Sequence, residues 1–185
     1  ALFPFVVNSI HHQSYPLHKI EWIILQNGDE EIADLIPQKM KDKFKRVHIE
    51  MLPSDHGLSL GELRNKAVEC SSESFIAFMD DDDIQFHTSL LARVKALIKY
   101  NADCVGCTLI GSYDLLQQKG SVASDGSHVF SEASMMFRRS FWGERGFNNK
   151  EKRGEAHGFL LGRQSRCIAV PYHFVLLAMV HGVNT

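Results

Sequence analysis

The sequence predicts one α/β domain in which a mixed central sheet is flanked by helices. Apolar runs that are typical of buried strands alternate with stretches whose apolar residues recur at helical spacing. This alternation indicates a layered sheet with right-handed crossovers. The 185 residues, 44% of them hydrophobic, are enough for one full core. We therefore expect a single domain over 1–185, with one half over 1–110 and the other over 111–185.

In the first half, the alternation of helices and strands is regular. The opening helix has its apolar residues on one face and ends at Tyr15-Pro16. An Asn-Gly pair at Asn27 marks the turn after the first expected strand. Ser59 and Glu62 form a capping box that begins a later helix. Helices are expected over 1–13, 32–44, 60–70 and 90–100, and strands over 20–25, 46–52, 75–84 and 103–110.

In the second half, the pattern becomes less regular, and mixed or antiparallel pairing is expected. A Gly/Ser-rich loop over 120–127 separates two of its strands, and 141–147 is an aromatic turn or short helix. The expected strands cover 113–119, 133–138, 167–171 and 173–180, and the expected helix covers 155–163.

Composition and charge exclude several classes of protein. The chain has 20 basic and 22 acidic residues, a net charge of -2, so binding to nucleic acid or to an anionic membrane through bulk charge is not expected. It has no signal peptide and no apolar run of about 20 residues, although an anchor upstream of residue 1 stays open.

The cysteines indicate a reducing compartment. Cys104 and Cys107 are three residues apart on an expected strand, so their side chains point to opposite faces. There is no second cysteine pair that could complete four zinc ligands. We read them as small buried residues, and this favours a cytoplasmic location.

The most informative stretch is Phe75 to Ile84, in which an apolar run ends in four consecutive aspartates, Asp80 to Asp83. Ligands bind at the carboxyl ends of strands in open α/β sheets. Four adjacent carboxylates repel one another unless a cation or hydrogen-bond donors compensate them. Hard oxygen ligands favour Mg²⁺ or Mn²⁺, together with a phosphorylated ligand. The alternative is a solvated acidic turn in which Asp83 serves as a helix N-terminal charge.

Several short motifs occur in order along the chain. They are Gln13-Ser14-Tyr15-Pro16, Glu21-Trp22-Ile23-Ile24, Leu63-Arg64-Asn65-Lys66-Ala67, Phe75 to Ile84, Lys152-Arg153-Gly154-Glu155 with Phe159-Leu160, and His181-Gly182-Val183-Asn184-Thr185. Together they resemble the GT-A nucleotide-sugar glycosyltransferases, especially family 2. Within that family, the motifs are most similar in character to those of members from large viruses. The resemblance implies a Rossmann-like fold with a nucleotide-binding half over 1–110, an acceptor-side half over 111–185, and a first strand ahead of this numbering.

The resemblance also implies a metal site for Mn²⁺ or Mg²⁺ at the family's DXD motif. Asp82 falls on the metal ligand, with Asp80 and Asp81 beside it. Asp80 and Asp82 should point the same way if the strand continues to Asp82. His181 falls where many such transferases have another metal or diphosphate ligand, whereas a histidine at a strand end is as often only hydrogen-bonded structure.

Three further residues are expected near the nucleotide. Arg64 and Asn65 match nucleotide-contacting positions, where a guanidinium can bind a phosphate or stack on a base. The alternative for both is an ordinary solvated helix face. Asn27 stands where the family commonly has an aspartate that reads the base. An amide both donates and accepts, so this departure weakens the case for uridine, although a UDP-sugar donor is still favoured.

Glu155 is the candidate general base. An inverting transferase uses a carboxylate to take the acceptor hydroxyl's proton while that oxygen attacks the anomeric carbon. The family usually has Glu-Asp here and this chain has Ala156 in the second place, so the base is Glu155 or another carboxylate such as Glu132 or Asp125. The alternative for Glu155 is a helix N-terminal acid. Trp142 and its neighbour are expected in the core.

The resemblance thus implies a metal-dependent, inverting glycosyltransferase that acts on an acceptor hydroxyl of a glycan or glycoprotein. A nucleotidyltransferase that makes sugar nucleotides is the first alternative. A carbohydrate- or cation-binding module without activity is the second. A phosphatase is disfavoured because Ile84 and Gln85 follow the carboxylates where a small hydroxyl residue would be expected.

Overall fold

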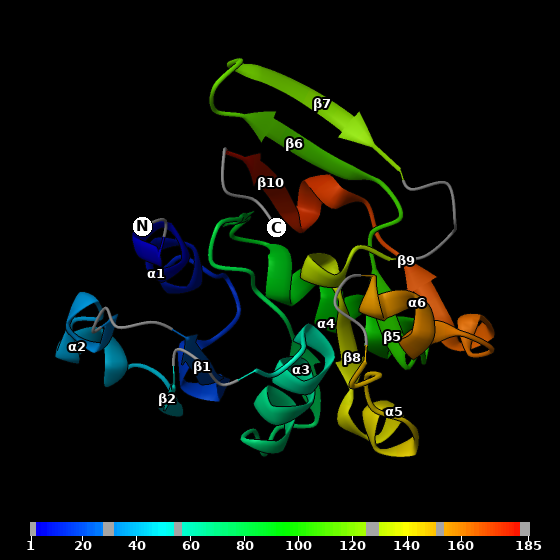
Figure 1. The fold of residues 1–185 in the computed structure, drawn as a ribbon, viewed down its shortest axis with the longest axis horizontal. Coiled ribbons are helices and arrows are strands. Elements are labelled where there is room, and N and C mark those ends of the chain that lie inside the picture. Colours follow the sequence, from blue (N-terminus) through cyan, green and yellow to red (C-terminus); the bar gives the residue numbers. More distant parts are fainter. Residues whose placement is uncertain (1–2, 28–31, 54–56, 125–129, 151–153, 182–185) are drawn as a thin grey trace.

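A computed structural model describes residues 3–27, 32–53, 57–124, 130–150 and 154–181 (Figure 1). Helices and strands alternate as expected, and the class is mixed α/β. The α-helices are α1 Phe3–His11, α2 Gln38–Lys41, α3 Leu60–Glu69, α4 Ser89–Lys99, α5 Arg139–Glu144 and α6 Glu155–Leu160. The strands are β1 Glu21–Asn27, β2 Arg46–Leu52, β3 Phe75–Ala77, β4 Ile84–Gln85, β5 Cys104–Gly106, β6 Ile110–Asp114, β7 Lys119–Ala123, β8 Met136–Arg138, β9 Cys167–Ala169 and β10 Leu176–Val180.

The strands form three sheets. β1 and β2 pair in parallel, from Glu21 opposite Arg46 to Asn27 opposite Leu52. A second sheet has the order β3-β8-β5-β9, in which β8 is antiparallel to both neighbours and β5 and β9 are parallel. A third has the order β4-β10-β6-β7 and is also mixed. Figure 1 shows the β6–β7 hairpin with β10 at one end of the molecule and the β1–β2 pair with α1 and α2 at another.

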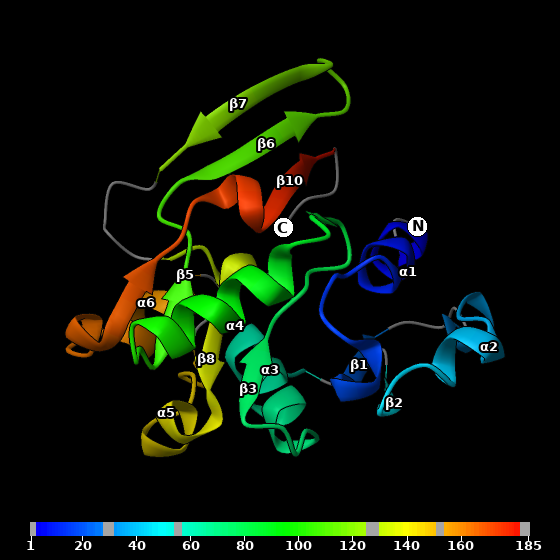
Figure 2. The ribbon, with the colours of Figure 1, turned by 180° about the vertical axis from the view of Figure 1, so that it is seen from behind.

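The core consists of apolar side chains between these sheets and their helices. One cluster joins α1, β1 and α4 through Phe3, Trp22 and Leu97. A second is aromatic: the rings of Phe147 and Phe159 stack with centroids 4.2 Å apart. Figure 2, the view from behind, shows α4 lying over β5 and β8, which it contacts. The helices thus cover the sheets, as an α/β core requires.

A pocket of about 560 Å³ separates β1 from β3, and side chains of both strands line it. Among the described residues, β1 pairs with β2 alone and β3 with β8 alone, so no hydrogen-bonded ladder crosses the pocket. The pocket also reaches Arg64 and Asp80.

The expected helix over 32–44 is wrong, because the chain forms a 3₁₀ turn at Ile32–Leu35 and then the short α2. Pro37, with a ψ of 139°, stands between them. A residue before proline avoids the helical region and proline has no N–H to donate, so the apolar spacing did not yield one continuous helix.

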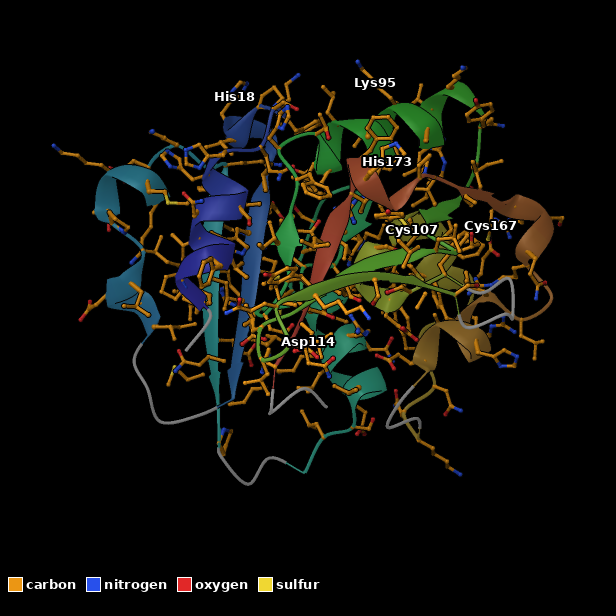
Figure 3. The ribbon with its side chains drawn as sticks, turned by 90° about the horizontal axis from the view of Figure 1, so that it is seen from above. His18, Lys95, Cys107, Asp114, Cys167 and His173 are labelled. Carbon is orange, nitrogen blue, oxygen red and sulfur yellow. The ribbon has the colours of Figure 1, made fainter. Side chains whose placement is uncertain are left out.

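The expected strand over 113–119 is also wrong. β6 ends at Asp114, whose Oδ1 accepts the N–H groups of Leu116 and Gln117, both at 2.8 Å. This side-chain turn reverses the chain, and β7 returns over residues that were expected to be loop. Figure 3 labels Asp114 where β6 ends.

Five other strands are shorter than expected. The strand expected over 103–110 ends as β5 at Gly106, and the one expected over 133–138 begins at Met136 after a 3₁₀ turn. The acidic strand, expected over 75–84, ends at Ala77, and β4 begins separately at Ile84. β9 ends at Ala169. Tyr172–Phe174 is a 3₁₀ turn that precedes β10, so the strand expected over 173–180 begins only at Leu176.

In the part of the chain that the structure describes, no helix has the length and apolar character needed to cross a membrane.

Candidate active site

Asp80 to Asp83 lie in the turn between β3 and β4. The expectation that Asp80 and Asp82 point the same way depended on a continuous strand, and β3 ends before both of them. Instead, the turn separates the aspartates. Asp80 lies toward α3, Asp82 lies toward the end of β10, Asp81 is exposed and Asp83 is buried.

Asp82 and His181 come together through sheet pairing. β10 runs antiparallel to β4, with Leu177 opposite Ile84, so the residues after β10 approach the residues before β4. His181 Nε2 and Asp82 Oδ2 are 3.2 Å apart. The two side chains are 17% and 28% exposed, so both stay accessible to a ligand. Two of the three residues expected to bind metal, Asp82 and His181, are therefore neighbours although 99 positions separate them.

On the other side of the turn, Arg64 lies between two carboxylates. Its Nε donates to Glu155 Oε1 at 2.5 Å, and its Nη1 lies 3.9 Å from Asp80 Oδ1. The guanidinium also stacks over Phe78, with Cζ 4.6 Å from the ring centroid. Phe78, which holds Arg64 in place, was not singled out in the sequence, because an aromatic residue in an apolar run looks like any core residue.

Two of the aspartates, Asp80 and Asp83, have pKa values above the usual value of a carboxyl group. Burial, with Asp80 and Asp82 nearby, raises the pKa of Asp83 to about 7, although the N–H of Met179 donates to its Oδ1 at 3.2 Å. Burial also raises the pKa of Asp80, and Arg64 counteracts this. The Asp80 side chain nevertheless keeps 41% of its surface exposed, so a ligand can reach it.

The donor types of Asp80, Asp82 and His181 suit a hard divalent cation, although in this structure their ligand atoms are not gathered within 4.8 Å of one another. Asp80 and Asp82 offer carboxylate oxygens and His181 an imidazole nitrogen, which are ligands that Mg²⁺ and Mn²⁺ accept. Burial is the main cause of the raised pKa of Asp80, and the charges of Asp82 and Asp81 add to it, so a bound cation would compensate this repulsion. The residues present are therefore compatible with the expected metal.

Asn65 is placed differently from the expectation of a nucleotide contact. Its Oδ1 accepts from Trp142 Nε1 and from the N–H of Phe147, both at 2.8 Å. Its Nδ2 donates to Phe147 O and to Asn149 Oδ1, also at 2.8 Å. The amide thus uses both donors and both acceptor positions within the protein. Asn65 fixes the segment after α5 against α3.

Asn27 is the last residue of β1, opposite Leu52. The Gly-containing turn after it lies outside the described residues. Asn27 therefore ends a parallel strand at the edge where ligands of α/β sheets bind, and its contact with a base stays a prediction.

Glu155 begins α6 and is 2% exposed. Its Oε1 accepts from Arg64 Nε, so the carboxylate is both buried and paired in this structure. Glu132, the alternative base, accepts the N–H of Ala156 at 3.1 Å and thus caps α6. Asp125 lies outside the described residues.

Comparison with known proteins agrees with the fold. The sequence model of Glycosyl transferase family 2 matches residues 2–158. The chain is 24% identical over 129 residues to Glycosyltransferase AglE of Haloferax volcanii, a match that covers 70% of this chain and 40% of that protein. The chain thus spans less than half of this relative.

Two solved structures share the fold. S. aureus TarS in complex with UDP-GlcNAc has a TM-score of 0.71 and 15% identity, over 96% of this chain and 54% of that one. Mannosyltransferase PcManGT of Pyrobaculum calidifontis, in complex with GDP-Man and Mn²⁺, has a TM-score of 0.66 and 14% identity, over 97% and 52%. The expected GT-A fold is therefore confirmed.

Proposed function

Because the chain belongs to Glycosyl transferase family 2, we propose that it transfers a sugar from a nucleotide-diphosphate donor to a hydroxyl of a glycan or glycoprotein acceptor, with inversion at the anomeric carbon. A UDP-sugar is the favoured donor. The observation that carries this proposal is that the turn after β3 places Asp82 beside His181 on one side and Asp80 beside Arg64 on the other.

Each of these residues has a distinct part in the proposal. Asp82, Asp80 and His181 would hold Mn²⁺ or Mg²⁺, which supplies Lewis-acid stabilisation of the departing diphosphate. The Arg64 guanidinium, stacked on Phe78, can turn from Asp80 to a phosphate oxygen without losing its ring contact. Asp81, exposed beside them, is proposed to contact the nucleotide sugar.

Glu155 stays our candidate base, with Arg64 as its gate. When Arg64 binds the donor's phosphates, its ion pair with Glu155 weakens, and the carboxylate becomes available to take the acceptor's proton. Glu132, which holds the first turn of α6, then positions Glu155. Donor binding would thus precede acceptor activation.

Two observations bear on the identity of the donor nucleotide. The TarS complex contains UDP-GlcNAc and the PcManGT complex contains GDP-Man with Mn²⁺, so proteins of this fold bind either base. Asn27 at the end of β1 has an amide where the family commonly has an aspartate. An amide both donates and accepts hydrogen bonds, so it can pair with more than one nucleotide base. UDP is therefore the first donor to test, and GDP the second.

The experiment measures Mn²⁺-dependent release of nucleotide from a panel of UDP- and GDP-sugars. We expect release from at least one UDP-sugar, lost with EDTA and reduced at least ~100-fold in Asp82→Asn, since the metal's charge stabilisation is worth several kcal/mol. Nucleotide with Mn²⁺ at 100 times its Kd should also stabilise the folded protein by ~2.7 kcal/mol. Asp34→Asn, an exposed carboxylate on the 3₁₀ turn before α2, is the matched control.

Two results would count against the proposal. Asp82→Asn with activity within tenfold of wild type removes the metal assignment. Glu155→Gln is expected to lose ~10²–10⁴-fold in kcat with donor binding unchanged, so a loss below tenfold in a folded variant assigns the base to another carboxylate.

A further inference from the structure

A second cluster of metal-binding side chain types lies away from the acidic turn, where β2 meets the end of α3. It consists of His48, Glu50 and Cys70. His48 and Glu50 are two positions apart on β2, so their side chains leave the same face of the strand. Cys70 is the C-terminal cap of α3, which brings its thiol over that face.

From this arrangement we propose that His48, Glu50 and Cys70 bind a zinc ion that links β2 to the end of α3. Thiolate, imidazole and carboxylate are the three ligand types of protein zinc sites. The set differs in kind from the acidic turn, where oxygen ligands prevail, so the two sites select different metals. The inference does not rest on the proposed sugar transfer.

The distances fit this ion. One ligand atom from each residue lies within 4.8 Å of the others. Cys70 Sγ is 3.4 Å from Glu50 Oε2, and His48 Nε2 is 4.0 Å from the same oxygen. Zinc bond lengths of about 2.0–2.3 Å in a tetrahedron place ligand atoms ~3.4–3.6 Å apart. The thiol and the carboxylate are already at this spacing, and a side-chain rotation of His48 must bring the imidazole closer to both.

Neighbouring residues hold the carboxylate in the required orientation. Lys66 Nζ binds Glu50 Oε1 at 2.8 Å, which leaves Oε2 turned toward the thiol and the imidazole. Arg46 Nη2 donates to the carbonyl oxygen of Cys70 and so fixes the end of α3 over β2. A hydrogen-bonded outer shell of this kind is what orients the ligands of metal sites.

Zinc binding also requires that the thiol lose its proton and that the ion can reach the site from solvent. Cys70 donates its thiol hydrogen to Glu50, so zinc displaces this proton to solvent as the sulfur–zinc bond forms. The His48 side chain is 39% exposed and the Glu50 side chain 31%, so an ion can enter from solvent. Three protein ligands leave the fourth position to a water molecule.

The test uses Co²⁺ as a spectroscopic probe of the full chain. We expect a thiolate-to-cobalt charge-transfer band that saturates at one equivalent and disappears when Zn²⁺, but not Mn²⁺, is added. Cys70→Ser should abolish the band, and His48→Gln should weaken Zn²⁺ binding at least tenfold. Glu69→Gln, which changes an exposed acid one residue before Cys70, should leave both unchanged.

A second measurement does not depend on the variants. Zn²⁺ should slow alkylation of Cys70 by iodoacetamide at least tenfold, as read by mass spectrometry, and leave the half-buried Cys167 unaffected. The proposal is overturned if the wild-type protein gives no charge-transfer band, if the band persists in Cys70→Ser, or if Zn²⁺ fails to protect Cys70.

Discussion

Asp82 and Asp83 are adjacent in the sequence but lie in different environments. Asp82 remains 28% exposed beside His181, whereas Asp83 is buried and accepts the N–H of Met179. The chain between β3 and β4 turns between them, so one carboxylate remains accessible to solvent and the other faces protein. The protonation state of Asp83 therefore affects the stability of the protein and the electrostatics of the turn.

The first prediction concerns Asp83→Asn in metal-free protein. Burial raises the pKa of Asp83 in the folded state to about 7, from 3.8, so between these values the folded protein holds a proton that the unfolded chain lacks. The stabilisation that this bound proton gives the folded state is thus complete below pH ~4 and is lost as the pH rises through ~7. The asparagine has no proton to lose, so Asp83→Asn should gain in stability relative to wild type between pH 5 and 8.

Urea unfolding at pH 5, 6.5 and 8 with EDTA measures this difference. It should grow by no more than ~1.4 kcal/mol per pH unit and exceed ~1 kcal/mol at pH 8. Asp34→Asn should show a flat difference, since Asp34 is exposed. A flat difference for Asp83→Asn as well would mean that Asp83 is already ionised when buried.

At the scale of elements, α3 contacts segments that come much later in the chain. A capping box begins it: Ser59 Oγ accepts the N–H of Glu62, and the Glu62 side chain accepts the N–H of Ser59. Arg64 and Asn65 then reach α6 and the segment after α5 from successive positions of this helix. The helix start therefore sets the positions of both residues relative to the acidic turn.

The second prediction is that Gly61→Ala destabilises the protein while Gly143→Ala stabilises it. A Cβ at Gly61 would lie 2.1 Å from the carbonyl oxygen of Asn148, so the segment held by Asn65 must move. A Cβ at Gly143 in α5 meets nothing within 4 Å. Helix propensity alone favours alanine at both positions, by about 1 kcal/mol.

Thermal and urea unfolding of both variants test this contrast. We expect Gly61→Ala to lose ~1–3 kcal/mol through overpacking and Gly143→Ala to gain ~0.5–1 kcal/mol. Similar gains in both would show that the segment around Asn148 moves away from α3 without cost.

At the scale of the whole molecule, the three sheets differ in burial. β5 is buried at every position and pairs with both β8 and β9. β7 is exposed at every position and pairs only with β6 among the described strands. Local stability follows the burial and hydrogen bonding of each segment, so the molecule should open in parts rather than uniformly.

The third prediction is a hydrogen-exchange order. Amides of 104–106 should exchange at least ~100-fold more slowly than those of 119–123, because opening β5 requires global unfolding and opening the β6–β7 hairpin does not. Pepsin peptides and mass spectrometry give both rates in one experiment. Equal rates would show that the hairpin and the central sheet unfold as one unit.

Local signals in the sequence predicted much of this protein. The capping box at Ser59 begins α3, the aspartates follow β3, and the alternation of helices and strands gives the α/β class. The order of the motifs pointed to the family that the comparison confirms. Such features depend on residues close together in the chain, where propensity and hydrophobic period act directly.

The site itself was decided by tertiary structure. The Asp82–His181 contact spans 99 positions and the Arg64–Glu155 ion pair spans 91. The motif predicted that Asn65 contacts the nucleotide. In the structure, its side-chain amide makes its hydrogen bonds to α5 and to the segment after α5. Arg93, on an apparently amphipathic helix, is fully buried because Ser134 and Met135 offer their carbonyl oxygens to it. No local pattern encodes such contacts, since they arise only when distant segments pack together and must satisfy one another's charges and hydrogen bonds.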